Sequence, residues 1–230
     1  MAEFPKIDEE GGGDGRQRFF LRTLGSLALS DADGRPVKLR TRKALLLLAC
    51  LSAEPGQAWP RERLASFLWG DRQEEQARNS LRTALSDIRG VMGEGALAVE
   101  RATVALGDGA LSSDIARLRD RAAADDPPVA LEDIYGGEFL ADAGDAIDAP
   151  EWLAATRTQA RDLAIDIMDR SIERLAADGK MDAAIRSARE LLSLDPLREA
   201  SHRRLMRLHA DLGERSRAIA QYQSCTQLLQ

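Results

Sequence analysis

The sequence has few of the residues from which catalytic and metal centres are usually built. Only two of its 230 residues are cysteine and two are histidine. Cys50 and Cys225 stand in largely apolar stretches, which favours buried thiols over a disulfide framework or a metal site. His202 and His209 are seven residues apart on one predicted helix, where packing is the expected role. No Walker-type loop, dinucleotide fingerprint or serine elbow occurs, so the sequence predicts neither an enzyme nor a bound cofactor or metal.

A long apolar run is also missing. The longest one, residues 44–51, has eight residues, whereas a membrane-spanning helix needs roughly 20. The N-terminus does not have the basic segment followed by an apolar segment that marks a secretory signal. The sequence therefore predicts a cytoplasmic protein without a membrane partner.

Aromatic residues make up only 4% of the chain and charged residues 30%. A composition rich in alanine, leucine and arginine favours helices. The charge is uneven, because residues 16–112 hold 15 basic and 11 acidic residues, net +4, and residues 113–230 hold 16 basic and 22 acidic ones, net −6. This asymmetry is typical of a DNA-binding module joined to one that does not bind DNA, although chance explains it equally well.

The first part of the chain predicts a tail and then a small sheet. Residues 1–15 include three consecutive glycines and five acids, and we expect them to be disordered. Short apolar runs at 19–24 and 26–29, an Asp-Gly turn signal within 31–34 and an alternating run at 36–39 follow. These features predict an antiparallel sheet.

Three helices and a hairpin come next. Thr41 is a plausible N-cap for the first helix, and Asp71 and Glu74 have capping-box spacing at the start of the third. The predicted helices span 41–53, 60–69 and 71 to about 92, and the predicted hairpin strands span 97–101 and 103–106. Strands, three helices and a terminal hairpin in this order describe a winged helix-turn-helix.

The second half predicts helical repeats. A helix at 113–124 is followed by an Asp-Asp-Pro-Pro break at 125–128, and from Pro150 onward the pattern is helical. Gly179 and Gly213 are 34 residues apart, which is the tetratricopeptide period. The matched pairs at this spacing are Ala176 and Ala210, Ala184 and Ala218, Ile185 and Ile219, and Leu194 and Leu228. Two unrelated amphipathic hairpins are the alternative. The predicted fold class is mainly α with a small β part, a winged helix-turn-helix followed by a tetratricopeptide-like helical repeat domain.

The third predicted helix has an apolar and a polar face at 100° per residue. The predicted core face consists of Ala77, Leu81, Ala84, Leu85, Ile88 and Met92. The candidate DNA-binding residues of this helix are Arg78, Arg82 and Arg89 on one shoulder and Asn79, Thr83 and Ser86 further out. Arginine can bind phosphates or donate twice to guanine, and asparagine can pair with adenine. An ordinary solvated helix surface is the alternative.

Further basic residues flank this helix in the sequence. Arg101 and Thr103 lie near the tip of the predicted hairpin, from which an arginine could enter a minor groove. Arg61 in the second helix and Arg42, within the basic stretch 40–43, are candidate phosphate contacts, as is Arg63. Solvated charge is the alternative for each of them.

Several motifs resemble a known family. Leu24-Gly25, Leu68-Trp69 and "ARNSLRTALSDIR" at 77–89 resemble the OmpR-like winged helix of the antibiotic-regulatory-protein (SARP-type) class of bacterial regulators. "YGGEFLADAGDAIDAPEWLAATR" at 135–157 and "LLSLDPLREASHRRLMRLHADLGERSRAIAQY" at 191–222 are similar to the bacterial transcriptional activator domain. The resemblance covers roughly residues 19–230.

The resemblance implies a transcriptional activator that binds direct repeats in double-stranded DNA near promoters. It also implies contact with RNA polymerase, a homodimer on DNA and base recognition by the helix that starts near Glu74. The expected domains are a tail at 1–15, an OmpR-like winged helix at 16–110 and a bacterial transcriptional activator domain at 111–230.

Two other functions stay open from the sequence. The acidic repeat domain and the small basic surplus of the first domain are also consistent with a protein-interaction module that does not bind DNA. The second repeat lacks its terminating proline at Gln230, which would fit the regulatory front end of a longer multidomain protein, including the sensory part of an enzyme.

Overall fold

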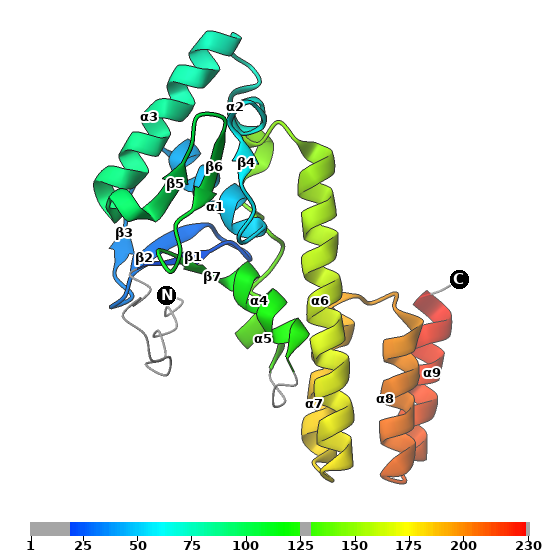
Figure 1. The fold of residues 1–230 in the computed structure, drawn as a ribbon. Coiled ribbons are helices and arrows are strands. Elements are labelled where there is room, and N and C mark those ends of the chain that lie inside the picture. Colours follow the sequence, from blue (N-terminus) through cyan, green and yellow to red (C-terminus); the bar gives the residue numbers. More distant parts are fainter. Residues whose placement is uncertain (1–18, 125–129, 229–230) are drawn as a thin grey trace. The chain divides into compact units, whose positions relative to one another are not determined.

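The computed structural model describes residues 19–124 and 130–228 (Figure 1). The predicted disordered tail at 1–15 and the Asp-Asp-Pro-Pro break at 125–128 lie outside the described residues. The chain divides into two compact units, which are described separately. The first unit consists of Met1–Arg119 and Gly137–Ala160, and the second of Asp120–Gly136 and Arg161–Gln230.

The first unit has the predicted order of strands, three helices and a hairpin. Its elements are β1 (Phe19–Arg22), β2 (Ala28–Asp31), β3 (Pro36–Val37), α1 (Arg42–Ala53), β4 (Trp59–Pro60), α2 (Arg61–Trp69), α3 (Glu74–Met92), the 3-10 helix η1 (Glu94–Ala96), β5 (Leu97–Val99), β6 (Thr103–Leu106), β7 (Ser112–Ser113), the start of α4 (Asp114–Ala123), the 3-10 helix η2 (Gly144–Ala146) and the start of α6 (Pro150–Ala177). The strands form two sheets, with the orders β3-β2-β1-β7 and β4-β6-β5. The winged helix predicted from the sequence is therefore confirmed.

Two short strands were not predicted. In β7, Ser112 pairs with Phe20 of β1 in a parallel register, whereas the sequence placed Ser113 at the start of a helix. In β4, Trp59 pairs with Val104 of the hairpin. Strands of two residues are too short to show an alternating pattern, so only their distant partners reveal them.

Of the two helix caps predicted from the sequence, the structure contains one. The Thr41 hydroxyl accepts a hydrogen bond of 3.2 Å from the amide of Ala44, which confirms it as the N-cap of α1. The capping box at Asp71 and Glu74 is wrong, because α3 begins at Glu74 with Gln73 as its N-cap and without a side-chain cap. Arg72 N–H donates to the Trp69 carbonyl over 3.0 Å, so Asp71 lies in the turn that closes α2.

The core of the first unit lies around α1. This helix is fully buried from Leu46 to Ala53, consistent with its almost continuous apolar sequence. The six residues that α3 buries are those predicted for its core face: Ala77, Leu81, Ala84, Leu85, Ile88 and Met92. Their burial leaves the polar side of α3 facing outward.

The segment Gly137–Ala160 packs into the first unit through aromatic side chains. The Trp152 ring lies 5.8 Å from Trp59, 5.4 Å from Phe67 and 6.0 Å from Phe139, measured between ring centroids. The guanidinium of Arg157 donates to the carbonyls of Phe139 and Leu140. This compact unit thus extends beyond residue 110, at which the sequence ends the winged helix, because contacts across the chain rather than local pattern define it.

A largely buried carboxylate connects β1 with the start of α4. Asp114, at the start of α4, accepts hydrogen bonds of 2.6–2.9 Å from the amide and hydroxyl of Thr23 and from the amide of Leu24. Burial raises the pKa of Asp114, and hydrogen bonds from Thr23, Leu24 and Ile115 oppose this rise. A satisfied buried acid of this kind fixes the connection between β1 and α4.

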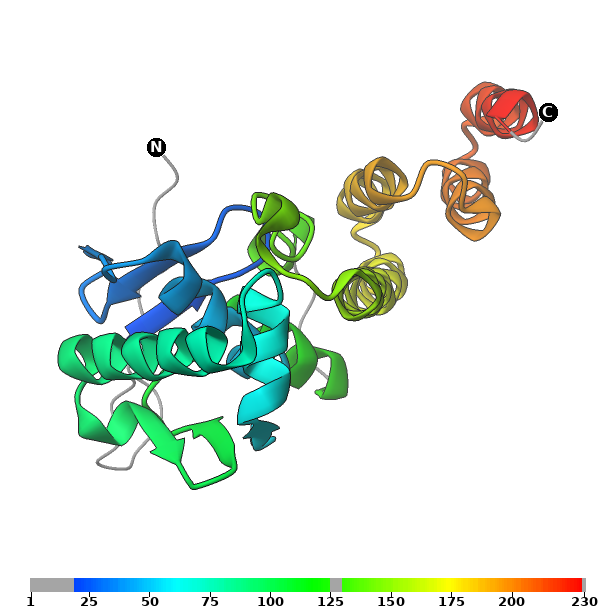
Figure 2. The same cartoon turned by 90° about the horizontal axis from the view of Figure 1, so that it is seen from above.

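The second unit consists of helices that follow one another, and those from α6 onward, coloured yellow to red, are seen end-on in Figure 2. Its elements are α5 (Leu131–Ile134), the remainder of α4 and α6, α7 (Met181–Leu194), α8 (Glu199–Asp211) and α9 (Arg215–Leu228). Gly179 and Gly213 have φ of +75° and +74°, a conformation that favours glycine. Lys180 N–H donates to Leu175 over 2.9 Å, and Glu214 N–H donates to His209 over the same distance. The two turns, 34 residues apart, therefore have the same conformation, as the predicted repeat requires.

Across the described ranges, no helix combines the length and the apolar character needed to cross a membrane.

Candidate nucleic-acid interface

The outward side of α3 presents a row of polar side chains. Arg78, Asn79, Arg82, Thr83 and Ser86 are exposed. Arg89 is partly covered, with 32% of its side chain accessible. Because the opposite face of α3 packs in the core, the predicted DNA-binding residues of this helix share one surface, as their spacing requires.

The arginines of this surface differ in their partners. Arg78 forms an ion pair with Glu74 one turn earlier and lies 3.5 Å from Glu62 of α2. Arg89 lies 3.7 Å from Glu94. Within the described part of the chain, Arg82 has no acidic partner, and its guanidinium donates to the Asn79 side-chain oxygen over 3.0 Å. Arg82 is thus the arginine of α3 whose charge is least compensated.

The wing is the hairpin of β5 and β6. Arg101 lies exposed in its turn, without an ion-pair partner among residues 19–124 and 130–228. The Thr103 hydroxyl donates to the Glu100 carboxylate over 3.1 Å. Arg61 N–H donates to the Ala102 carbonyl over 2.9 Å, so the turn is attached to the first residue of α2. This attachment holds the wing tip in place.

The remaining predicted phosphate contacts lie elsewhere on the first unit. Arg42 forms an ion pair of 3.5 Å with Asp142 and donates to its backbone carbonyl, so its charge is partly neutralised within the unit. The guanidinium of Arg63 lies 4.7 Å from the ring centroid of Trp59 and 5.2 Å from that of Phe67. Such stacking covers the aromatic rings and limits the reach of Arg63.

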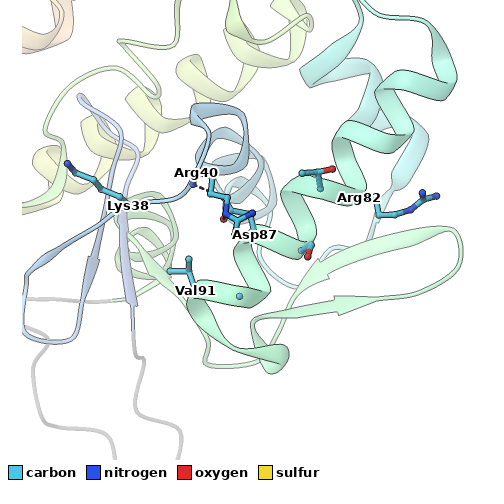
Figure 3. Close-up of a pocket in the computed structure, with 8 residues that line it drawn as sticks. Lys38, Arg40, Arg82, Asp87 and Val91 are labelled. Carbon is cyan, nitrogen blue, oxygen red and sulfur yellow. Dashed lines mark hydrogen bonds and ion pairs between the residues drawn. The ribbon is translucent and has the colours of Figure 1, made fainter.

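An open hollow of about 600 Å³ runs along the polar face of α3 (Figure 3). Its lining residues are Lys38, Arg40, Arg82, Thr83, Ser86, Asp87, Gly90 and Val91. The contribution of Lys38 and Asp87 to this surface was not predicted from the sequence. Helical projection alone could have placed Asp87 beside the polar face, but its contact with Arg40, 47 residues earlier, has no local signal.

The cysteines and histidines lie inside the two units. Both cysteines are buried, as predicted, and burial raises the pKa of the Cys50 thiol to about 12. His202 contacts the Pro196 carbonyl over 2.8 Å, and His209 contacts the Glu214 carboxylate over 2.7 Å. In the part of the chain that the structure describes, no three histidine, cysteine or acidic side chains gather as a metal site would require.

Comparisons with known proteins agree with this architecture. The family model of the bacterial transcriptional activator domain matches residues 108–230, more than half of the chain. The model of the C-terminal domain of transcriptional regulatory proteins matches residues 34–105. No curated protein sequence matches the chain.

A solved structure shares the fold. It is Mycobacterium tuberculosis EmbR in complex with a low-affinity phosphopeptide, with a TM-score of 0.69 and 21% sequence identity. The match covers 92% of this chain and 60% of the EmbR chain, so this chain spans a little over half of that protein's length.

Proposed function

Because the chain belongs to the bacterial transcriptional activator domain family, with the winged-helix and activator-domain arrangement of SARP-type regulators, we propose that it activates transcription by binding a specific DNA sequence through α3. The wing and α2 supply additional contacts to the sugar-phosphate backbone. The repeat unit contacts RNA polymerase, and two copies bind adjacent direct repeats.

The polar face of α3 carries this proposal. A helix of 19 residues whose apolar stripe is buried presents its other side as a rod that fits the major groove. Arg82 and Asn79 are exposed on that side and are hydrogen-bonded to each other, so their donors and acceptor are oriented together. Arginine recognises guanine with two donors and asparagine recognises adenine, which are the chemistries that distinguish base pairs.

The wing supports the same orientation. Arg101 is exposed at the turn of a hairpin that is tied to α2, and an uncompensated arginine at such a tip suits the negative potential of a minor groove. Arg78 and Arg89, which have acidic neighbours, are better suited to phosphate contacts that release those partners.

Selection from a random duplex pool at about 50 mM and 200 mM salt tests the proposal. We expect an enriched motif that occurs twice at a spacing near one helical turn, with log K falling against log salt at a slope of about −4 to −5 for four to six phosphate contacts. Arg82→Ala should reduce affinity for that motif by roughly 1–3 kcal/mol while leaving binding to random duplex nearly unchanged.

The matched control is Arg72→Ala, which removes an exposed arginine just before α3 whose side chain contacts Ser80 instead of lining the hollow. It should alter motif preference little. Absence of any enriched motif at low salt would contradict sequence-specific binding.

The polymerase and dimer contacts need separate tests. Addition of the protein should increase transcription in vitro from a promoter that carries the selected motif. A duplex with one motif copy should bind one molecule of the protein, and a duplex with two copies should bind two. Binding to the motif without any rise in transcription would contradict the activator function and leave DNA recognition intact.

A further inference from the structure

The segment between β3 and α1 approaches the polar face of α3 from the side away from Arg82. Arg40 N–H donates to the Asp87 carboxylate over 2.8 Å, and the Arg40 Nε lies 3.6 Å from the same carboxylate. Figure 3 shows Arg40 beside Asp87 on one side of α3 and Arg82 on the other. Residues from two distant parts of the sequence thus form the two sides of the hollow.

The two members of the Arg40–Asp87 pair differ in exposure. The Asp87 side chain is 6% exposed, whereas the Arg40 side chain is 86% exposed. The carboxylate is therefore covered by the segment that it holds, and the guanidinium remains free to contact a ligand. An acid on a DNA-facing helix would repel phosphate, but here a cation lies in front of it.

The charge of the hollow points to an anion. Three cations, Lys38, Arg40 and Arg82, line it together with one acid, Asp87. The Ser86 hydroxyl adds a hydrogen-bond donor, and a helix glycine, Gly90, leaves open space in which a ligand can approach the backbone. Arginine and hydroxyl donors in an open, hydrated surface are typical of contacts to phosphate oxygens.

We propose that this hollow binds a phosphate of the DNA backbone, with Arg40 as the contacting residue and Asp87 as the residue that positions it. The proposal rests on the proposed function, in which α3 lies in the major groove. A helix in that groove has a sugar-phosphate strand on each side. Arg40 contacts the strand on the Asp87 side, where α3 itself offers an acid and no arginine of its own.

Salt dependence of binding tests the contact. The full chain is titrated into a labelled 30-base-pair random-sequence duplex and into the selected motif at about 50 mM and 200 mM salt. Loss of one phosphate contact in Arg40→Gln should reduce the slope of log K against log salt by about 0.9, so that the affinity ratio of unmodified protein to variant falls about 3.5-fold over this range. The loss should be equal for both duplexes, because a phosphate contact carries no base information.

A matched control removes the same charge elsewhere. Arg35 pairs with Asp33 in the turn between β2 and β3 and does not line the hollow. Arg35→Gln should leave the slope unchanged. A slope change of the same size in both variants would show a general charge effect and overturn the proposal.

The Asp87 variants test positioning. Asp87→Ala removes the acceptor of the Arg40 amide and should weaken binding about as much as Arg40→Gln, with no further loss in the double variant. Asp87→Asn keeps an acceptor oxygen and should restore binding. If Asp87 acts only by repelling DNA, both variants will bind more tightly than the unmodified protein, which would overturn the positioning role.

The outcomes separate this proposal from the proposed function. An enriched motif that depends on Arg82, together with an unchanged slope in Arg40→Gln, overturns the phosphate contact alone. No DNA binding by the unmodified protein at 50 mM salt overturns both. Tryptophan fluorescence would reveal a failure of Asp87→Ala to fold. Arg40→Gln still tests the phosphate contact in that case, because the Arg40 side chain is exposed and its replacement should not affect folding.

Discussion

The first unit depends on contacts between more distant parts of the sequence than the second, in which consecutive helices pack together. Thr23 and Asp114 are 91 residues apart, and Arg42 and the Asp142 carbonyl are 100 residues apart. In the second unit the separations are shorter: the Arg198–Asp169 ion pair spans 29 residues, and the Leu131 amide contacts Glu190 over 59. Contacts between residues far apart in the sequence form only when the whole unit folds. In stacked helical hairpins, each hairpin contributes its own stability and that of the interface with its neighbour. The unit that presents the proposed DNA-binding surface is therefore expected to be the more cooperative one.

The tryptophans follow the same division. All three tryptophans, Trp59, Trp69 and Trp152, belong to the first unit, and the second unit is packed with aliphatic and small side chains such as Ala184, Ala188 and Leu191. Tryptophan fluorescence thus reports the first unit alone, and far-UV circular dichroism reports both. This difference allows each half of the comparison to be tested in the intact chain.

The largest effect is expected for Phe139→Ala. Phe139 is fully buried against Trp152, and its truncation should reduce the free energy of unfolding of the first unit by about 3–5 kcal/mol. Urea titration followed by tryptophan fluorescence measures it. A loss below about 1 kcal/mol would show that the segment Gly137–Ala160 is not part of the cooperative unit.

Leu191→Ala tests the other half. Leu191 is fully buried in α7, and truncation should cost about 2–5 kcal/mol. We expect the circular dichroism transition to move and the tryptophan transition to stay nearly unchanged. Equal shifts of both signals would show that the two units unfold as one.

Asp114→Ala should have an intermediate effect on the first unit. It leaves the amides of Thr23 and Leu24 without their acceptor in a buried site, which costs about 1–3 kcal/mol. Asp114→Asn, which keeps one acceptor oxygen, should lose less. Tryptophan-detected urea titration compares the two, and identical losses would contradict a hydrogen-bonding role.

The smallest effect is expected at Glu214, and it depends on pH. The hydrogen bond from His209 holds the pKa of Glu214 below its ordinary 4.5, and contacts with Arg217 add to this. A carboxylate whose folded pKa is lowered stabilises the fold fully above about pH 4.5 and loses this contribution as the pH falls through the lower value. Glu214→Gln should therefore lower the melting temperature at pH 7, with the difference from the unmodified protein shrinking below pH 4.5.

Thermal unfolding followed by circular dichroism measures this difference. Glu199→Gln, which alters an exposed pair with Arg203 on α8, is the control and should behave like the unmodified protein. A difference at Glu214 that does not depend on pH would contradict the ionic origin of the effect.

The elements with long local patterns were predictable. The six core residues of α3 follow from helical spacing alone. With 3.6 residues per turn, these apolar side chains lie along one side of the helix, and that side packs in the core. The Thr41 cap and the glycine turns at 179 and 213 likewise depend on residues close in the sequence. The predicted capping box at Asp71 was wrong because this residue lies in the turn that closes α2, before α3 begins at Glu74.

The residues that α3 contributes to the candidate site were predictable from the sequence. The contacts of the residues beside α3 were not. The spacing of Arg82, Asn79 and Ser86 assigns them to one helix face. Nothing local links Arg40 to Asp87, or indicates that Arg42 is engaged by Asp142, because these contacts join residues 47 and 100 positions apart.

Local periodicity and turn chemistry act between residues a few positions apart, so the amino-acid sequence was sufficient for the three helices and the hairpin of the winged helix, for the matching glycine turns and for the polar face of α3. The pairing of β7 with β1, the inclusion of Gly137–Ala160 in the first unit and the hollow beside α3 were determined by the tertiary structure. Each of these requires the chain to close a long loop, and the packing that favours one closure over another exists only in the folded molecule.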